Sequence, residues 1–242
     1  MILRINIKER YLWLLILFFL ILSFSITSKK FSSSNLDTQT LRESAEKNKS
    51  IKLVMFTPKD NIKQAICDLI KNEQKKIRAA IYFLTDKIIA HELIQAKKRN
   101  VDVEIVTCAS NLENEYNKIW LLHENGISVY IFDLPRKISK KNRYSNNRLM
   151  HHKFITFEKN IDGKNILING SFNCTVSAQK NNRENIVILD DKELFDQFNA
   201  EYEEIKKSSR PLSNYLHKKP IIEKDEPEEL SLKLSKKFWN IF

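Results

Sequence analysis

The chain reads Met-His-His-Lys-Phe-Ile-Thr-Phe-Glu over residues 150–158 and Gly-Ser-Phe-Asn-Cys-Thr over residues 170–175. Side chains alternate between the two faces of an extended strand. His151 and Lys153 therefore point to one face of a predicted strand, and His152 points to the other. This spacing places an imidazole, which titrates near neutral pH, beside a positive charge.

The same two segments supply the groups that a phosphate diester requires. An imidazole can attack phosphorus or pass protons, and a lysine ammonium can neutralise the phosphate oxygens. Ser171 and Asn173 are neutral donors of the kind that stabilise a charged transition state. They stand two residues apart and share one face if the stretch is extended. The pattern predicts a site that attacks, neutralises and holds a phosphate diester.

These motifs together resemble the phospholipase D superfamily. The chain has His-x-Lys at residues 151–153 with an acid five residues after the lysine, then Gly-Ser-x-Asn-x-Thr, then an acid eleven residues after the asparagine. It is most similar to the single-motif members, the bacterial endonuclease type and the mitochondrial cardiolipin-hydrolase type. The Phe-Thr-Pro run at 56–58, the Tyr-Phe-Leu-Thr run at 82–85 and the segment 97–101 extend the resemblance over residues 51–207.

The resemblance implies roles for six residues. The implied catalytic residues are His151, Lys153, Glu158 and Glu184, and the implied substrate-binding residues are Ser171 and Asn173. Glu158 stands where the family has aspartate, so the charge is kept and a methylene is added; in relatives this acid supports the site. Glu184 occupies the place of the carboxylate that orients the histidine and stabilises imidazolium. The cysteine and histidine spacings match no metal-site pattern, and we expect neither a metal nor another cofactor.

One copy of the motif cannot both attack phosphorus and protonate the leaving oxygen at the same moment. The chain has no second His-x-Lys followed by the Gly-Ser-x-Asn-x-Thr motif. We therefore expect a two-fold homodimer that brings His151 of each subunit to a shared site. One imidazole would form a phosphohistidine, and the other would protonate the leaving alcohol and then activate water.

The substrate class remains open between phospholipid and nucleic acid, because such a site recognises the diester itself. The 41 basic and 30 acidic residues give a formal charge of +11, which suits either anionic partner. A hydrophobic N-terminal segment favours phospholipase D activity over a metal-independent endonuclease. A non-catalytic module that only binds phosphate is the alternative from another functional class, and Glu158 is the feature in its favour.

Short apolar strands alternate with helical periods and predict an α/β domain, a mixed β-sheet sandwiched by helices. We expect strands at 52–56, 77–84, 101–107, 127–132, 150–157, 165–170 and 185–189. We expect helices at 62–70, 88–98, 112–124 and 191–207, with Gly126 capping the third. Residues 51–207 would form the catalytic domain.

Residues 11–28 carry no charge and follow Arg4, Lys8 and Arg10. About 1.5 Å of rise per residue would let this helix cross most of a hydrocarbon core of about 30 Å. The preceding positive charges favour a cytoplasmic N-terminus. Residues 1–28 are therefore interpreted as a membrane anchor, or alternatively a signal peptide, that places the domain outside the cytoplasm, anchored or secreted. Residues 29–50 are predicted to be a polar tether.

Residues 135–148 and 208–242 are two polar segments with possible binding roles. The loop 135–148 contains basic residues and no acid, ends beside the motif histidines, and could attract anionic substrate. Residues 208–242 form a polar tail in which 230–242 mixes apolar residues with lysines. That end could lie on a membrane, pack on the domain or remain disordered.

Overall fold

The structure is a computed structural model, and it describes residues 50–133 and 149–219. The predicted anchor at 1–28, nearly all of the tether, the basic loop 135–148 and the end of the tail lie outside the described residues. Among the residues that are described, no helix has the length and apolar content to cross a membrane.

Eight strands form one mixed sheet in the order β1-β7-β6-β5-β2-β3-β4-β8. β2, β3 and β4 pair in parallel, and the remaining neighbours pair antiparallel. The strands are β1 (Lys52–Phe56), β2 (Lys76–Ile81), β3 (Asp102–Cys108), β4 (Ser128–Phe132), β5 (Lys153–Phe157), β6 (Ile166–Gly170), β7 (Asn185–Leu189) and β8 (Ser209–Pro211). The predicted mixed sheet is confirmed.

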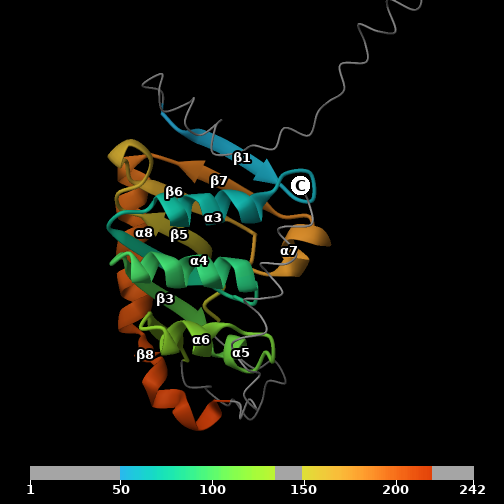
Figure 1. Cartoon of the computed structure of the whole chain (residues 1–242), viewed down its shortest axis with the longest axis vertical. Helices are drawn as coiled ribbons and strands as arrows, with labels where there is room; N and C mark the ends of the chain where they lie inside the picture. Colours follow the sequence, from blue (N-terminus) through green and yellow to red (C-terminus); the bar gives the residue numbers. More distant parts are fainter. Residues whose placement is uncertain (1–49, 134–148, 220–242) are drawn as a thin grey trace, which may run out of the picture.

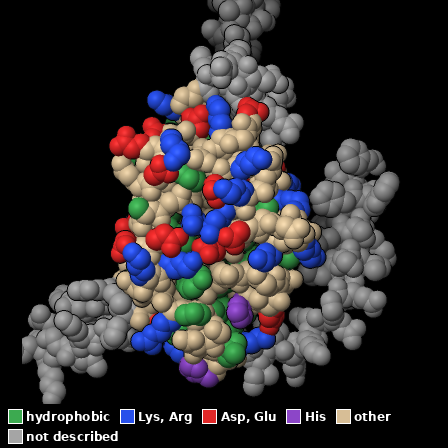
Figure 2. All heavy atoms as spheres, turned by 90° about the vertical axis from the view of Figure 1, so that its left-hand side faces the viewer, with side chains coloured by type: hydrophobic (Ala, Val, Ile, Leu, Met, Phe, Trp, Pro, Cys, Tyr) green, Lys and Arg blue, Asp and Glu red, His purple; other side chains and the backbone are tan. Residues whose placement is uncertain are grey.

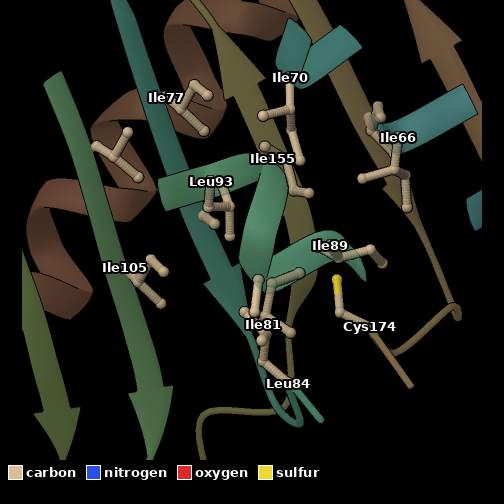
Figure 3. Close-up of a cluster of buried hydrophobic side chains, with 14 of the residues drawn as sticks. Ile66, Ile70, Ile77, Ile81, Leu84, Ile89, Leu93, Ile105, Ile155 and Cys174 are labelled. Carbon is tan, nitrogen blue, oxygen red and sulfur yellow. The ribbon is translucent and has the colours of Figure 1, made fainter. Parts of the chain in front are cut away.

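Helices cover both faces of this sheet (Figure 1). They are α3 (Ile62–Asn72), α4 (Lys87–Lys98), α5 (Ala109–Leu112), α6 (Ile119–Glu124), α7 (Val176–Lys180) and α8 (Lys192–Lys207), with 3-10 turns η1 (Ile161–Gly163) and η2 (Leu212–Lys218). The larger core lies between the sheet and α3, α4 and α6, and part of it is drawn in Figure 3. A second core lies under α8, where Tyr202 packs with Phe154. The alternation of β2 explains the two cores, because Ala79 and Ile81 face the first and Ala80 faces the second.

The predicted helix at 112–124 is wrong in its middle. The structure has two short helices, α5 and α6, separated by residues 113–118. Two asparagine side chains compete with a helical backbone there: Asn114 Oδ1 accepts from Tyr116 N at 2.9 Å, and Asn117 Nδ2 donates to Asn114 O at 2.6 Å. Gly126 follows α6 with a φ of +77°, the left-handed conformation expected just after a helix.

The folded part continues past the expected boundary at residue 207. β8 pairs antiparallel with β4, and η2 then packs Leu212 and Tyr215 against the main core. Tyr215 donates its hydroxyl to Asp133 Oδ2 at 3.2 Å. The first part of the predicted tail therefore closes the edge of the sheet beside β4.

The buried carboxylate of Glu73 fixes the edge of the domain at which β2 begins and β5 ends. Its Oε1 accepts from the backbone N–H groups of Lys75, Lys76 and Lys159 at 2.9, 3.0 and 2.9 Å. Its Oε2 accepts from Asn160 Nδ2 at 3.0 Å, and Glu73 is only 2% exposed. One side chain thus joins the loop before β2 to the turn after β5.

We expect Glu73→Ala to lower the free energy of unfolding by about 4 kcal/mol, because it leaves several buried donors without an acceptor. Chemical denaturation followed by circular dichroism measures the loss. Glu204→Ala is the matched control, since this α8 carboxylate is 67% exposed and pairs only with Lys207, so its removal leaves stability unchanged. A Glu73→Ala protein as stable as the control would show that this carboxylate does not hold the two segments together.

Candidate active site

His151 and Lys153 lie at the start of the central strand β5, at the end of the sheet where β2 and β6 terminate. Lys153 pairs with Ile81, the last residue of β2, and Tyr82 N donates to His152 O at 3.1 Å. Lys153 Nζ lies 3.0 Å from His151 Nδ1 and donates to His151 O at 2.6 Å. The imidazole is exposed, while Lys153 is only 9% exposed. The imidazole and the ammonium group thus share one face of the strand, as the alternation predicts.

Tyr82 packs against both of these groups. Its ring centroid lies 4.5 Å from that of His151 at an interplanar angle of 56°, and Lys153 Nζ lies 5.2 Å from the Tyr82 centroid. An aromatic ring at this distance attracts a cation and restricts the imidazole. Tyr82 belongs to the Tyr-Phe-Leu-Thr run at 82–85, and the resemblance implies no role for it. No local sequence signal separated it from a core aromatic residue.

The surroundings favour the neutral form of His151. Partial desolvation of this largely exposed imidazole lowers its pKa below the ordinary 6.5, and the positive charge of Lys153 and the neighbouring His152 lower it further. Burial also lowers the pKa of Lys153, an effect that the nearby carboxylate of Glu184 opposes. At neutral pH the site therefore holds a neutral imidazole beside an ammonium group.

Ser171 follows the end of β6 and is fixed to the start of β7. Ser171 Oγ accepts from Asn185 N at 3.1 Å, and Ser171 N donates to Asn185 O at 3.0 Å. Gly170 makes this approach possible, because a Cβ there would lie 2.0 Å from Asn185 O. The Gly-Ser pair is thus explained by close strand packing at the edge of the site.

Asn173 lies against the segment that leaves β2. Its Oδ1 accepts from Phe83 N at 3.3 Å, and the adjacent Cys174 forms a parallel bridge with Leu84. An Asn173 side chain held through Oδ1 keeps its NH₂ group as a donor. Thr175, the last residue of the motif, caps α7 by accepting from Ala178 N at 3.1 Å and is therefore structural.

Glu184 lies close to this group but does not contact the histidine. Its backbone is held by Thr57, whose Oγ1 accepts from Glu184 N at 2.9 Å. Its Oε1 accepts from Asn182 Nδ2 at 2.9 Å, and its charge acts on Lys153. In this structure the Glu184 carboxylate contacts Asn182 and His151 Nδ1 faces Lys153 Nζ, so the expected contact between Glu184 and the His151 ring is not made.

Glu158 lies outside the site. It follows the far end of β5, five residues from Lys153, which corresponds to about 16 Å along a strand. Glu158 Oε1 pairs with Lys75 Nζ at 2.6 Å at the surface, beside the Glu73 carboxylate. A catalytic role is therefore not supported for Glu158. The added methylene relative to aspartate fits a partly exposed ion pair.

The remaining candidates lie away from the site or are inert. His152 points to the other face, where its Nε2 lies 3.4 Å from Glu201 of α8. Cys174 is buried, and burial raises the pKa of its thiol. Within residues 50–133 and 149–219, no cluster of three or more histidine, cysteine, aspartate or glutamate side chains is arranged to hold a metal ion.

Comparison with known proteins identifies the family of this domain. The family model described as "Cardiolipin synthase, PLD-like domain" matches residues 66–206. A phospholipase D of Rickettsia prowazekii is 32% identical over 175 residues, which cover 72% of this chain and 76% of that protein. A mitochondrial cardiolipin hydrolase of Danio rerio is 28% identical over 59% of this chain and 56% of that protein.

Solved structures share the fold. Nuc from Salmonella typhimurium, a phospholipase D family member, has a TM-score of 0.56 at 24% identity and matches 67% of this chain and 98% of that one. NucT from Helicobacter pylori has a TM-score of 0.59 at 21% identity over 67% of this chain and 99% of that one. With the family model covering more than half of the sequence, the chain belongs to the phospholipase D-like family of phosphodiesterases.

Proposed function

We propose that this protein hydrolyses phospholipid headgroup esters as a phospholipase D, through a phosphohistidine formed at a site shared by two subunits. The observation that carries the proposal is the exposed imidazole of His151, whose Nδ1 lies 3.0 Å from Lys153 Nζ. The relatives called phospholipase D in five Rickettsia species support the lipid substrate over nucleic acid.

In the first step, Nε2 of His151 attacks phosphorus and the bond from phosphorus to the headgroup oxygen breaks. The two facing imidazoles share one proton; the partner's His151 carries it while the attacking ring is neutral, and gives it to the departing oxygen. Lys153 and the NH₂ group of Asn173 hold the non-bridging oxygens, on which charge accumulates in the transition state. The product of this step is a phosphatidyl group bonded to the ring nitrogen and a free headgroup alcohol.

In the second step, the partner's imidazole, now neutral, takes a proton from water. The water oxygen attacks phosphorus, and the bond from phosphorus to Nε2 breaks. Phosphatidic acid leaves, and the partner's imidazole again carries a proton. The cycle needs no redox partner and consumes one water, and the lysine ammonium supplies the charge neutralisation.

Attack by Nε2 requires that the ring proton reside on Nδ1, and that proton needs an acceptor. In the resting arrangement Nδ1 faces Lys153 Nζ at 3.0 Å. A bound phosphate attracts Lys153 toward its oxygens and exposes Nδ1. The Glu184 carboxylate, whose charge already acts on Lys153, then accepts a hydrogen bond from Nδ1–H, since catalytic hydrogen bonds often form only with substrate present.

We infer from the N-terminal sequence that the reaction takes place at a membrane. Residues 11–28 are uncharged and follow three basic residues, a pattern that favours an anchor or a signal peptide with the catalytic domain outside the cytoplasm. Either fate delivers the enzyme to a compartment where bilayer phospholipid is accessible.

A dual-substrate assay tests the substrate class. We expect the purified full chain to release headgroup from phospholipid while leaving DNA and RNA intact. A His151→Asn sample prepared in parallel controls for contaminating activity. Cleavage of nucleic acid without headgroup release would refute the lipid assignment and support the endonuclease.

The lowered pKa of His151 predicts how kcat/KM falls on the acid side of its pH profile. The neutral imidazole attacks, so kcat/KM falls as pH drops through the pKa of the site, and the midpoint lies below 6.5. Two facing imidazoles titrate as a pair, so the midpoint belongs to the site rather than to one ring. Steady-state rates on a soluble diester between pH 4 and 8 measure it.

Tyr82 variants separate the causes of that shift. Tyr82→Leu removes the ring that covers part of the imidazole, and we expect the acid midpoint to rise toward 6.5, because desolvation is the largest cause of the lowered pKa. Tyr82→Phe keeps the ring and should keep the midpoint. A midpoint at or above 6.5 in the unmodified protein would contradict the proposed neutral nucleophile.

A further inference from the structure

Two large apolar side chains are exposed beside the site. Ile88, the second residue of α4, is 52% exposed, and Val176, the first residue of α7, is 48% exposed. The segment that ends at Ile88 begins at Tyr82 in the site, and Val176 lies three residues after Asn173. Each apolar residue is therefore a short distance along the chain from a group that handles the diester.

The two segments run side by side. Leu84 and Cys174 form a parallel bridge, and the backbone N–H groups of Thr85 and Asp86 both donate to Cys174 O at 3.0 Å. Figure 3 draws Leu84 and Cys174 within one cluster of buried side chains. The starts of α4 and α7 are thus fixed to each other, and Ile88 and Val176 belong to one rigid part of the molecule.

A third exposed apolar residue adjoins them. Tyr116 is 65% exposed in the loop between α5 and α6. The end of this loop is joined to the same segment, because Lys118 N donates to Leu84 O at 3.0 Å. Glu115 holds the Tyr116 hydroxyl and, with Glu113, supplies the acidic groups of the loop.

Lysines without acidic partners lie among these side chains. Lys87 precedes Ile88, Lys180 ends α7, and Lys118 ends the loop. None of the three forms an ion pair with a carboxylate in the described part of the chain. Burial, and then the charge of Lys87, lower the pKa of Lys118, so the two ammonium groups repel each other.

The side of the molecule along which α8 runs is different. Figure 2 shows basic and acidic side chains next to one another there. Lys206 pairs with Glu104 at 2.9 Å, and Arg78 pairs with Glu203 at 3.1 Å. The α8 side therefore neutralises its own charges, whereas Lys87, Lys118 and Lys180 leave charges that an anionic partner can neutralise.

We propose that this surface docks on a bilayer that contains anionic phospholipid. The docking surface is defined by Ile88, Tyr116 and Val176 with Lys87, Lys118 and Lys180. Its apolar side chains enter the region beneath the headgroups, and its lysines meet the lipid phosphates. The inference rests on the proposed phospholipase function and specifies how the site reaches its substrate.

The composition favours a bilayer over a protein partner. Protein interfaces concentrate aromatic residues and arginine in a buried centre and are poor in lysine. Here three separate segments each contribute one exposed apolar side chain and one lysine, a combination that suits the interface of an anionic membrane. Residues 82–88 and 173–176 connect this surface to the site, so docking brings headgroup phosphates toward the imidazole.

A double variant, Ile88→Glu with Val176→Glu, tests the surface by activity. Neither α4 nor α7 has an acid in its first turn, and glutamate there suits the positive end of a helix, so the fold is retained. We expect headgroup release from phosphatidylglycerol-containing vesicles to fall about tenfold or more. Hydrolysis of soluble bis-p-nitrophenyl phosphate stays unchanged. Leu216→Glu, an equally exposed site on η2, is the matched control.

A fluorescent probe tests the surface without activity. The three native cysteines are buried, so Val176→Cys introduces an accessible thiol for an environment-sensitive NBD label. Ala200→Cys, exposed on α8, is the control. Both proteins keep residues 11–28, so their comparison isolates the docking surface. We expect a blue shift and quenching by acyl-chain doxyl lipid for the Val176 label on anionic vesicles, and neither change for the Ala200 label.

The outcomes separate the two proposals. A Val176 label that stays in water while the protein cleaves vesicle phospholipid would refute the docking surface alone. If the Val176 label enters the bilayer but the protein cleaves no phospholipid, the proposed function is refuted and the docking surface is supported. A blue shift that appears with rising protein concentration, without vesicles, would show that a second copy of the chain covers this surface and would refute docking on a bilayer.

Discussion

Replacing His151 with asparagine is expected to lower kcat/KM by about a thousandfold or more on both phospholipid and a soluble diester. Asparagine occupies a similar volume and donates a hydrogen bond, but it cannot form a bond to phosphorus or carry the proton to the leaving oxygen. In a shared site the substitution removes the nucleophile and the acid together. Steady-state kinetics on purified protein measure the loss.

His152→Asn is the matched control. The adjacent imidazole points to the opposite face and lies beside Glu201, so its removal should leave the rate nearly unchanged. Equal activity of His151→Asn and the unmodified protein would remove the nucleophile from the account. A chain that binds phosphate and cleaves no diester in either form would instead be the non-catalytic module.

Replacing Lys153 with methionine is expected to lower kcat/KM by roughly a hundredfold to a thousandfold, because a single charged donor to the transition state has that effect. Methionine fills the space of the lysine stem, which is 9% exposed, so packing against Tyr82 is kept. The loss should appear mainly in kcat, since charge on the non-bridging oxygens grows in the transition state.

The pH profile gives this variant a second readout. Burial lowers the pKa of Lys153 below its ordinary 10.5, so kcat/KM of the unmodified protein falls as pH rises through that lowered value. Lys153→Met should lack this step, while the decline caused by loss of the proton that the two imidazoles share should remain. Lys98→Met, at the exposed end of α4, controls for the loss of a surface charge. A full rate in Lys153→Met would contradict phosphate binding by this ammonium.

Strand alternation and apolar periodicity were sufficient for the fold and for the pairing at the centre of the site. His151 and Lys153 stand two residues apart on a strand whose register with β2 fixes their face, so sequence spacing translated directly into contact. The helices at 62–70 and 88–98 were equally predictable, because their buried residues repeat at helical spacing.

Tertiary contacts decided what the spacing could not. Glu158 stands only five residues after Lys153 in sequence, yet those residues form a strand, so Glu158 lies at the opposite end of β5. Tyr82 approaches His151 because β2 and β5 are neighbours in the sheet, which no local pattern encodes. The break between α5 and α6 depends on asparagine side chains that bond to the backbone more favourably than a continuous helix would allow.

The central claim is that phosphorus bonds to His151 at a site completed by a second subunit. Rapid quenching of the full chain with a short-chain phospholipid, followed by mass spectrometry of peptides, tests it most directly. The account predicts an acid-labile phosphatidyl group on His151 of one subunit in each dimer. Full turnover by a monomer, or a covalent group on any other residue, would contradict it.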